Sequence, residues 1–254
     1  MARRRAVDKS QSVDVEGRLP LLYKSVVPIT QEQHGTTHLR TARDFDFARH
    51  VNAIPLACDE FSQAMRDFPI VFTGSSHPTP LALVGLSNGV NDHVMADGSW
   101  TKGTYIPAYL RRYPFLLVNE TDTSDRQILC ADMSSVFLQP IEDEDSSALF
   151  TPTGEMSDRL SDVLEFAKRY ETAMKRTGDV MRVVKDLDLM QASTVTLTKG
   201  DKTAKIEGFS VIAEDRVRAL DDAQLADLAR RGLLGLFTAH QMSLANFSSM
   251  GALA

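Results

Sequence analysis

Two segments of the chain, FSQAMRDFPIVF (residues 61–72) and IPAYLRRYPFLL (residues 106–117), match position by position at an offset of 45 residues. Both keep an arginine, an aromatic residue followed by proline, and three apolar residues in step. Proline disfavours the α conformation of the residue before it and so ends a helix, while the apolar triplet after it suits a buried strand. Each segment therefore predicts a helix, a stop and a strand.

The similarity extends beyond the two segments. Polar turns are expected at Thr73–Pro80 and Asn119–Asp125, and returning strands at Leu83-Val84 and Ile128-Leu129, which are again 45 residues apart. We therefore predict two αββ-like units that pack together. Chance recurrence of aromatic-proline stops is the alternative explanation.

The rest of residues 20–140 is also predicted to be rich in β-structure. Leu21–Tyr23 and Val26–Ile29 are apolar and suit short extended segments. Asp97-Gly98 predicts a tight turn between extended segments, so a third strand is expected within Val90–Trp100. Residues 1–19 are polar and charged, and we predict a disordered tail there.

The C-terminal half, residues 151–250, is predicted to be mainly helical and to follow a linker at Ile141–Ser147. Apolar residues recur at intervals of three and four, which predicts an amphipathic helix carrying Met156, Leu160, Val163, Leu164, Ala167, Tyr170 and Met174. Thr177-Gly178 is its expected stop, with a second helix or a bent extension over Val180–Leu189. Thr194–Lys199 and Ala204–Ile212 alternate around Gly200-Asp201 and predict one β-hairpin.

Two helices are expected after the hairpin. Asp221 and Gln224 have the spacing of a capping box, which marks a helix start. The last helix is predicted over Leu233–Phe247, with an apolar stripe of Leu233, Phe237, His240, Leu244 and Phe247. The fold class is therefore α+β, and we predict one domain over residues 20–254.

Composition restricts the classes of partner. The 254 residues are 43% hydrophobic and 24% charged, as in ordinary globular proteins, and the formal net charge is −6. Nucleic-acid binding usually needs a basic face, so no nucleic-acid partner is expected. Met1-Ala-Arg-Arg-Arg-Ala is not followed by an apolar segment, and no run reaches the roughly 18 apolar residues of a membrane span. We predict a cytoplasmic protein, with non-classical export to the cell surface as the alternative.

Local catalytic and metal-binding motifs are absent from the sequence. It contains no phosphate loop, dinucleotide fingerprint, His-Glu-x-x-His, Cys-x-x-Cys or Gly-x-Ser-x-Gly motif. His34 and His38 are expected to be exposed loop histidines, and Asp92, His93 and Asp97 to belong to a turn; a metal site is the alternative for both groups.

Two further residues are of types that can act in catalysis. His240 lies in an apolar stripe, where a hydrogen-bonded core histidine is expected and a catalytic base is the alternative. Cys58 stands beside Asp59 and Glu60, whose carboxylates would raise its pKa, so a reactive thiolate is not expected. We predict no metal, no cofactor and no catalytic residue that the sequence can identify.

One patch combines the residue types that dominate binding hot spots. It contains the single tryptophan and three of the five tyrosines of the chain. Trp, Tyr and Arg offer large contact areas with polar ends. The candidate partner-binding residues are Trp100, Tyr105, Tyr109, Arg111, Arg112 and Tyr113; the alternative is that these aromatic residues fill the core.

Several motifs resemble those of the SapC family over roughly residues 21–247. They are Ile54-Pro-Leu-Ala57, Phe68-Pro-Ile-Val-Phe72, Asp97-Gly-Ser-Trp100, Arg111-Arg-Tyr-Pro-Phe115, Gly208-Phe-Ser-Val211 and Ala239-His-Gln-Met-Ser-Leu244. The resemblance implies a bacterial protein of a family that takes its name from a surface-layer gene cluster and that has no biochemical activity assigned to it as a family. Members are often encoded near TonB-dependent receptors, tryptophan halogenases and cupin-like proteins, which implies a role around uptake or peptide modification.

Three functions are compatible with this sequence. The leading hypothesis is a non-catalytic accessory protein that recognises a peptide or protein partner. A structural surface-layer (S-layer) protein is the second, although it would require export. An enzyme with a dispersed site around His240 or Asp92-His93 is the third, and the oligomeric state is not predicted.

Overall fold

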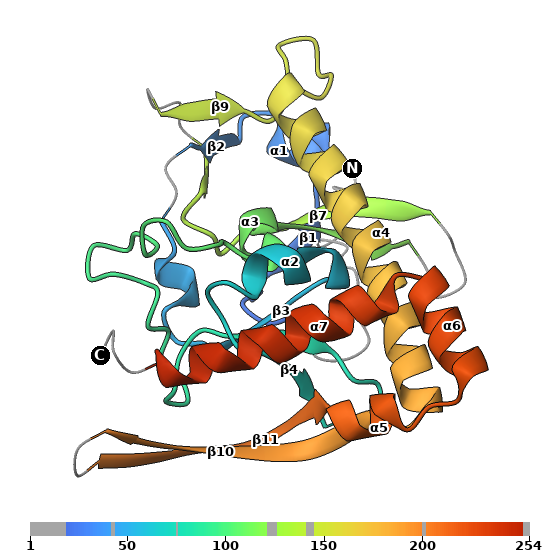
Figure 1. The fold of residues 1–254 in the computed structure, drawn as a ribbon. Coiled ribbons are helices and arrows are strands. Elements are labelled where there is room, and N and C mark those ends of the chain that lie inside the picture. Colours follow the sequence, from blue (N-terminus) through green and yellow to red (C-terminus); the bar gives the residue numbers. More distant parts are fainter. Residues whose placement is uncertain are drawn as a thin grey trace, which may run out of the picture. The chain divides into compact units, whose positions relative to one another are not determined.

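The computed structural model describes residues 19–41, 44–74, 76–120, 126–140, 145–199 and 202–250 (Figure 1). The chain divides into two compact units, each built from two separate stretches. Unit 1 comprises Met1–Ala42 and Arg112–Lys168, and unit 2 comprises Arg43–Arg111 and Arg169–Ala254. The predicted tail lies outside the described residues except for Leu19, and the single domain over residues 20–254 stays a prediction.

Unit 1 contains two small antiparallel sheets, with strand orders β1-β7-β6 and β8-β2-β9. The strands are β1 (Val26–Pro28), β2 (His38–Arg40), β6 (Phe115–Asn119), β7 (Gln127–Asp132), β8 (Leu138–Gln139) and β9 (Ser146–Ala148), and the short helix α1 (Gln31–His34) precedes β2. The predicted linker Ile141–Ser147 is wrong in its described part, because Ser146 and Ser147 belong to β9 and pair with β2.

Unit 2 is built around a five-stranded antiparallel sheet of order β10-β11-β4-β5-β3. Its strands are β3 (Ala53–Pro55), β4 (Ile70–Thr73), β5 (Pro80–Leu83), β10 (Met190–Lys199) and β11 (Lys202–Ile212). The helical segments with residues in unit 2 are η1 (Asp46–Ala48), η2 (Cys58–Glu60), α2 (Phe61–Ala64), α3 (Ala108–Arg112), α4 (Asp158–Asp186), α5 (Glu214–Arg218), α6 (Asp222–Arg230), α7 (Leu233–Ser243) and η3 (Leu244–Ser248). Of these, α3 ends in unit 1 and α4 begins there.

The predicted α+β class is confirmed, and both copies of the internal similarity form a helix followed by two antiparallel strands. The offset of 45 holds only through the first strand. Ile70 pairs with Ala82, whereas Phe115 pairs with Ala131, which lies 49 residues beyond Ala82. The predicted equivalence of the returning strands at an offset of 45 is therefore wrong, because the second connection is four residues longer. How the two hairpins pack together stays a prediction.

Two predicted extended segments are wrong. Leu21 and Leu22 form a turn in which Leu22 has a φ of 78° and the Tyr23 N–H donates to the Pro20 carbonyl. The third strand expected within Val90–Trp100 is a loop with one isolated bridge between Val94 and Trp100. The tight turn inside this loop is confirmed, since Gly98 has a φ of 82°.

Helix α4 continues through Thr177-Gly178, so the predicted stop is wrong. Buried side chains on both sides of this point, Tyr170 before it and Val180 and Val184 after it, anchor the helix in unit 2. Gly178 costs only about 1 kcal/mol of helix propensity, which such anchoring offsets. The Thr177 hydroxyl donates to the Ala173 carbonyl at 2.8 Å, so its side chain does not compete for a helix-ending hydrogen bond.

The predicted hairpin is confirmed and begins earlier than expected, at Met190. Its register shifts between Ser193 and Val195, where Glu207 and Gly208 of β11 face the single residue Thr194. Gly208 has a φ of 85°, so this is a β-bulge with glycine in the left-handed conformation. β11 pairs with β4 only through Phe209 and Ser210, on one side of the bulge.

Candidate functional site

The six candidate binding residues fall on both sides of the boundary between the two units, which separates Arg111 from Arg112. Trp100, Tyr105, Tyr109 and Arg111 belong to unit 2, and Arg112 and Tyr113 belong to unit 1. The candidate residues therefore form two groups, one in each unit.

Trp100 is a buried member of the group in unit 2. Its side chain is 8% exposed and its indole Nε1 donates to the Tyr105 carbonyl at 3.1 Å. The ring stacks on His93, with centroids 5.5 Å apart and an interplanar angle of 22°, and lies 5.5 Å from the ring of Phe45. Trp100 thus packs inside the loop, and its polar end is already bonded to the segment that carries Tyr105.

Tyr105 is fixed at both its backbone and its side chain. Its N–H donates to Asp67 Oδ2 at 2.7 Å, and its hydroxyl donates to Glu60 Oε1 at 2.9 Å. Glu60 is buried, and its carboxylate also accepts from the N–H groups of Ala108 at 2.7 Å and Ala57 at 2.9 Å. Burial and the negative charge of Glu60 raise the pKa of Tyr105 to about 12, so the phenol stays protonated.

Arg111 lies over this tyrosine and is exposed. Its guanidinium carbon is 5.7 Å from the centre of the Tyr105 ring. Nε donates to the Ile106 carbonyl at 3.0 Å and Nη2 donates to the Tyr105 hydroxyl at 3.1 Å. Together with Glu60, these contacts form a hydrogen-bonded chain, Glu60–Tyr105–Arg111, that runs from a buried carboxylate to an exposed cation.

Tyr109 is not part of the exposed surface of this group. It is buried, and its ring meets the ring of Tyr170 on α4 edge to face at a centroid distance of 6.4 Å. Its position favours the alternative interpretation, core packing, for this residue.

Arg112 and Tyr113 belong to an aromatic cluster of unit 1. The Arg112 guanidinium lies 5.5 Å from the centre of the Tyr23 ring, and Tyr23 meets Tyr113 edge to face at 5.4 Å. Tyr113 also contacts Phe137 at 6.2 Å. Burial raises the pKa of the half-buried Tyr113, and nearby Ser135 and Asp132 modify that shift.

His240, considered as a catalytic base, joins two strands of the sheet. Its Nδ1 lies 2.9 Å from the Ile70 carbonyl of β4, and its Nε2 accepts from the Ile212 N–H of β11 at 3.1 Å. These partners require a neutral ring with the proton on Nδ1. Burial lowers the pKa of His240 to about 4, in agreement with a neutral core histidine.

Neighbouring residues of α7 complete this bridge. The Ser243 hydroxyl accepts from the Ile70 N–H at 2.9 Å, and the Gln241 side-chain amide donates to the Ile212 carbonyl. Three side chains of one helix thus satisfy all four backbone groups of two strand residues that lie just beyond the β4–β11 pairing. His240 is structural in this arrangement.

His93 and its acidic neighbours do not form a metal site in the structure. Within the described ranges, no group of three His, Cys, Asp or Glu side chains could hold a metal ion. His93 is 8% exposed and packs between the rings of Trp100 and Phe68, and burial lowers its pKa. Asp97 instead accepts from the N–H and hydroxyl of Ser99, which lowers its pKa. That the protein carries no metal or cofactor stays a prediction.

The two histidines near the N-terminus differ from each other. His34 is not an exposed loop residue as expected: it ends α1, is buried, and its Nδ1 lies 3.2 Å from the backbone of Thr30. The same prediction is wrong for His38, which is half-buried and begins β2, with its Nδ1 3.1 Å from the Thr36 carbonyl.

Cys58 is buried in unit 2. Burial is the main cause that raises the pKa of its thiol to about 12, and the charge of Asp59 adds to it. The direction predicted from the sequence is confirmed, although the carboxylate is the smaller cause. Such a thiol is a poor nucleophile.

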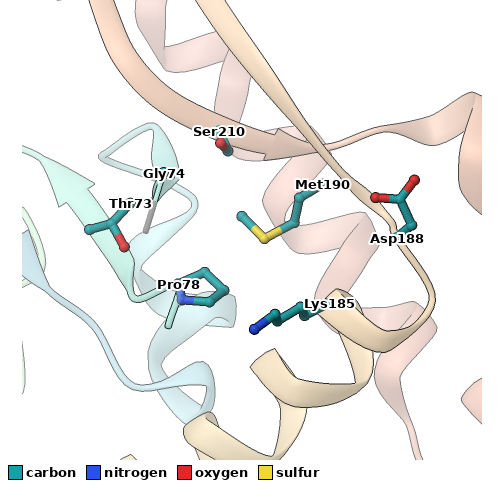
Figure 2. Close-up of a pocket in the computed structure, with 7 residues that line it drawn as sticks. All are labelled: Thr73, Gly74, Pro78, Lys185, Asp188, Met190 and Ser210. Carbon is teal, nitrogen blue, oxygen red and sulfur yellow. The ribbon is translucent and has the colours of Figure 1, made fainter. Parts of the chain in front are cut away.

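A small pocket lies in unit 2 (Figure 2), with a volume of about 180 Å³. Figure 2 shows Thr73, Gly74 and Pro78 on one side and Lys185 and Met190 on the other, with Asp188 and Ser210 completing the lining. The Lys185 ammonium donates to the Ser76 carbonyl at 2.9 Å. Pockets that enclose small-molecule ligands usually hold about 300–1,000 Å³, so this one is too small to define a ligand site.

A model of the SapC family matches residues 29–250. The chain belongs to the SapC family. No curated protein and no solved structure matches the chain. Among the residues that the structure describes, no helix of this SapC protein is long and apolar enough to cross a membrane.

Several motifs that characterise the SapC resemblance have structural roles in this chain. Gly208 forms the bulge of β11, and the following Phe209 and Ser210 make the pairing with β4. His240 and Ser243 of the late motif bridge the same two strands. Trp100 of the Asp-Gly-Ser-Trp motif packs the loop that leads to Tyr105.

Sequence reasoning missed two carboxylates of the candidate site, Glu60 and Asp67. A signal was present, since Glu60 and Tyr105 occupy equivalent positions of the internal similarity, 45 residues apart, and bond to each other. Residue type alone could not reveal this contact.

Proposed function

We propose that this SapC protein is a non-catalytic binding protein that recognises a peptide or protein partner through the surface formed by Tyr105 and Arg111. The observation that carries the proposal is the hydrogen-bonded chain Glu60–Tyr105–Arg111, which holds an exposed guanidinium over a tyrosine ring. Arginine and tyrosine are enriched among residues that dominate binding energy.

Preorganisation is the physical reason to expect binding at this surface. A long arginine side chain normally loses conformational entropy when it contacts a partner. The contacts of Arg111 with Tyr105 and Ile106 restrict its side chain before any partner arrives. An exposed guanidinium attracts carboxylates by its positive charge, so the expected partner presents an acidic group near it.

Partner capture with point variants tests this function. The tagged protein is used to retain proteins from native cells, and the retained partner is then purified and its affinity measured directly. Arg111→Ala should weaken that affinity about thirtyfold, corresponding to about 2 kcal/mol. Tyr105→Phe removes only the hydroxyl that links Arg111 to Glu60 and should cause a smaller loss.

Arg218→Ala is the matched control, because Arg218 is also an exposed arginine with a local carboxylate partner, Glu214. It should bind the partner as the unchanged protein does. Equal affinity for Arg111→Ala and Arg218→Ala would reject this surface as the binding site.

We also propose that the protein binds its partner in the cytoplasm. The family resemblance suggests that this binding serves outer-membrane uptake or peptide modification. Fractionation of native cells tests the location. Recovery of the protein in the surface-layer fraction would contradict it and favour the structural surface-layer hypothesis.

A further inference from the structure

The two edges of the unit 2 sheet differ in how well they resist pairing with another strand. β3 at one edge has three residues and ends in Pro55, which has no N–H to donate. β10 at the other edge has ten residues, Met190–Lys199, and its sequence MQASTVTLTK contains no proline and no charge before Lys199. Charges and proline are the usual protection of an edge strand, so β10 is the edge able to accept a partner.

The side chains of β10 alternate between two faces. Val195 and Leu197 are partly buried and pack against the cluster of Val71, Leu83, Phe209 and Phe247. Thr194 and Thr196 lie on the opposite face and are exposed. Beyond the bulge at Gly208, the described side chains are therefore apolar on one face, at Val195 and Leu197, and threonine on the other, at Thr194 and Thr196.

This alternation is self-complementary. In an antiparallel pair, directly opposite residues point to the same face of the sheet. When β10 pairs with a second β10 about a two-fold axis at Thr196, Val195 faces Leu197 of the other copy and Thr196 faces itself. Apolar positions then meet apolar positions, threonine meets threonine, and no like charges are opposed.

We propose that two copies of this chain form a dimer by antiparallel pairing of their β10 strands, which joins the two five-stranded sheets into one continuous sheet. We choose a second copy as the partner because β10 is complementary to itself: an antiparallel pair of β10 strands brings apolar residues together on one face and threonines together on the other, without opposing like charges. Figure 1 shows β10 and β11 as the long hairpin at the bottom of the view, with β10 as the sheet's last strand in the described part of the chain.

Charge placed at the axis gives a test that depends on the register. Light scattering coupled to gel filtration should give a mass that rises from 28.1 kDa towards twice that value between low and high micromolar concentrations. Thr196→Lys and Thr196→Asp should each weaken the dimer about fivefold, because identical charges then face each other. An equal mixture of the two variants should recover the unchanged affinity, because a lysine then faces an aspartate.

Thr238→Lys is the matched control, since it adds the same charge at an exposed position of α7 and should leave dimerisation unchanged. Hydrogen exchange of the unsubstituted protein provides a measurement that needs no variant: the β10 amides should become more protected as concentration rises. A monomer at every concentration overturns the proposal. A dimer that Thr196→Lys does not weaken, or that the mixture does not restore, also overturns it.

Discussion

Trp100 supports the loop that carries Tyr105, since it packs on His93 and Phe45 and donates to the Tyr105 carbonyl. Truncation of a buried tryptophan typically costs about 3–5 kcal/mol, and Trp100 is 8% exposed. We therefore expect Trp100→Ala to lower the free energy of unfolding by about that amount, measured by urea denaturation. An unchanged stability combined with lost partner capture would instead identify Trp100 as a binding hot spot.

His240 makes the stability of the fold sensitive to acid. Its pKa falls from 6.5 to about 4 in the folded protein because the ring is buried, so the unfolded chain binds the proton more tightly. Stability is then complete above pH 6.5 and is lost as the pH falls towards 4, by about 3 kcal/mol in total.

Replacement of His240 by glutamine isolates this effect. Glutamine keeps a donor and an acceptor but has no charge to gain, and all other titrating groups are common to both proteins. Between pH 6.5 and pH 4, the unfolding free energy should therefore fall about 3 kcal/mol further in the original protein than in His240→Gln. Parallel curves for the two proteins would contradict the bridging role.

At the level of single residues, chemical type was predictable and contact partners were not. The sequence correctly indicated a core histidine at His240 from its apolar stripe. It could not identify Ile70 as a partner, because 170 residues separate the two. For the same reason, the carboxylates that hold Tyr105 were missed, while the tyrosine and Arg111 were recognisable by type.

Two glycines show that the same substitution should have opposite effects in two elements. Gly208 has a φ of 85° in the bulge of β11, a conformation that costs other residues about 1–2 kcal/mol. Gly178 lies inside α4, and a side chain added there would meet nothing within 4 Å. Gly208→Ala should destabilise the protein by about 1–2 kcal/mol, and Gly178→Ala should stabilise it by about 1 kcal/mol.

Thermal and urea unfolding of the two variants measure this difference. Both glycines have open space around the added methyl group, so each is a control for steric effects at the other. Gly208→Asn should lose less than Gly208→Ala, since asparagine tolerates the left-handed conformation better. If Gly208→Ala stabilises the protein, the conformation of the bulge does not favour glycine at this position.

Elements with a strong local pattern were predictable. The periodicity before Thr177, the alternation of the hairpin and the capping box at Asp221 each correspond to an observed element. The stop at Gly178 failed because tertiary anchoring of α4 outweighs a local preference. The third strand failed because the loop around Asp97 obtains its order from side-chain contacts of Trp100 rather than from strand pairing.

At the scale of the whole chain, we propose that the two units unfold in one transition. Neither unit is a continuous stretch, and two of the three boundaries between them, after Arg111 and after Lys168, fall inside helices α3 and α4. Loss of structure in either unit would therefore shorten a helix that the other unit also uses. A single unfolding transition is what the predicted single domain over residues 20–254 would show.

The two cysteines allow a direct test, because Cys130 belongs to unit 1 and Cys58 to unit 2. Burial raises the pKa of Cys58 to about 12 and that of Cys130 to about 11, so neither should react with a thiol reagent in the folded state. In the unsubstituted protein, both thiols should become reactive at the same urea concentration, as measured by mass spectrometry of the peptides that carry each cysteine. Two distinct midpoints would mean that the units unfold separately.

The bridge formed by His240 joins parts of the chain that are synthesised at different times. Ile70 precedes His240 by 170 residues, which a ribosome adds in roughly 10–30 s. For most of that interval β4 lacks both β11 and α7, although Ile70, Val71 and Phe72 are completely buried in the finished fold. The surroundings of β4 can therefore be completed only after the C-terminal helices have been synthesised, many seconds after the strand itself.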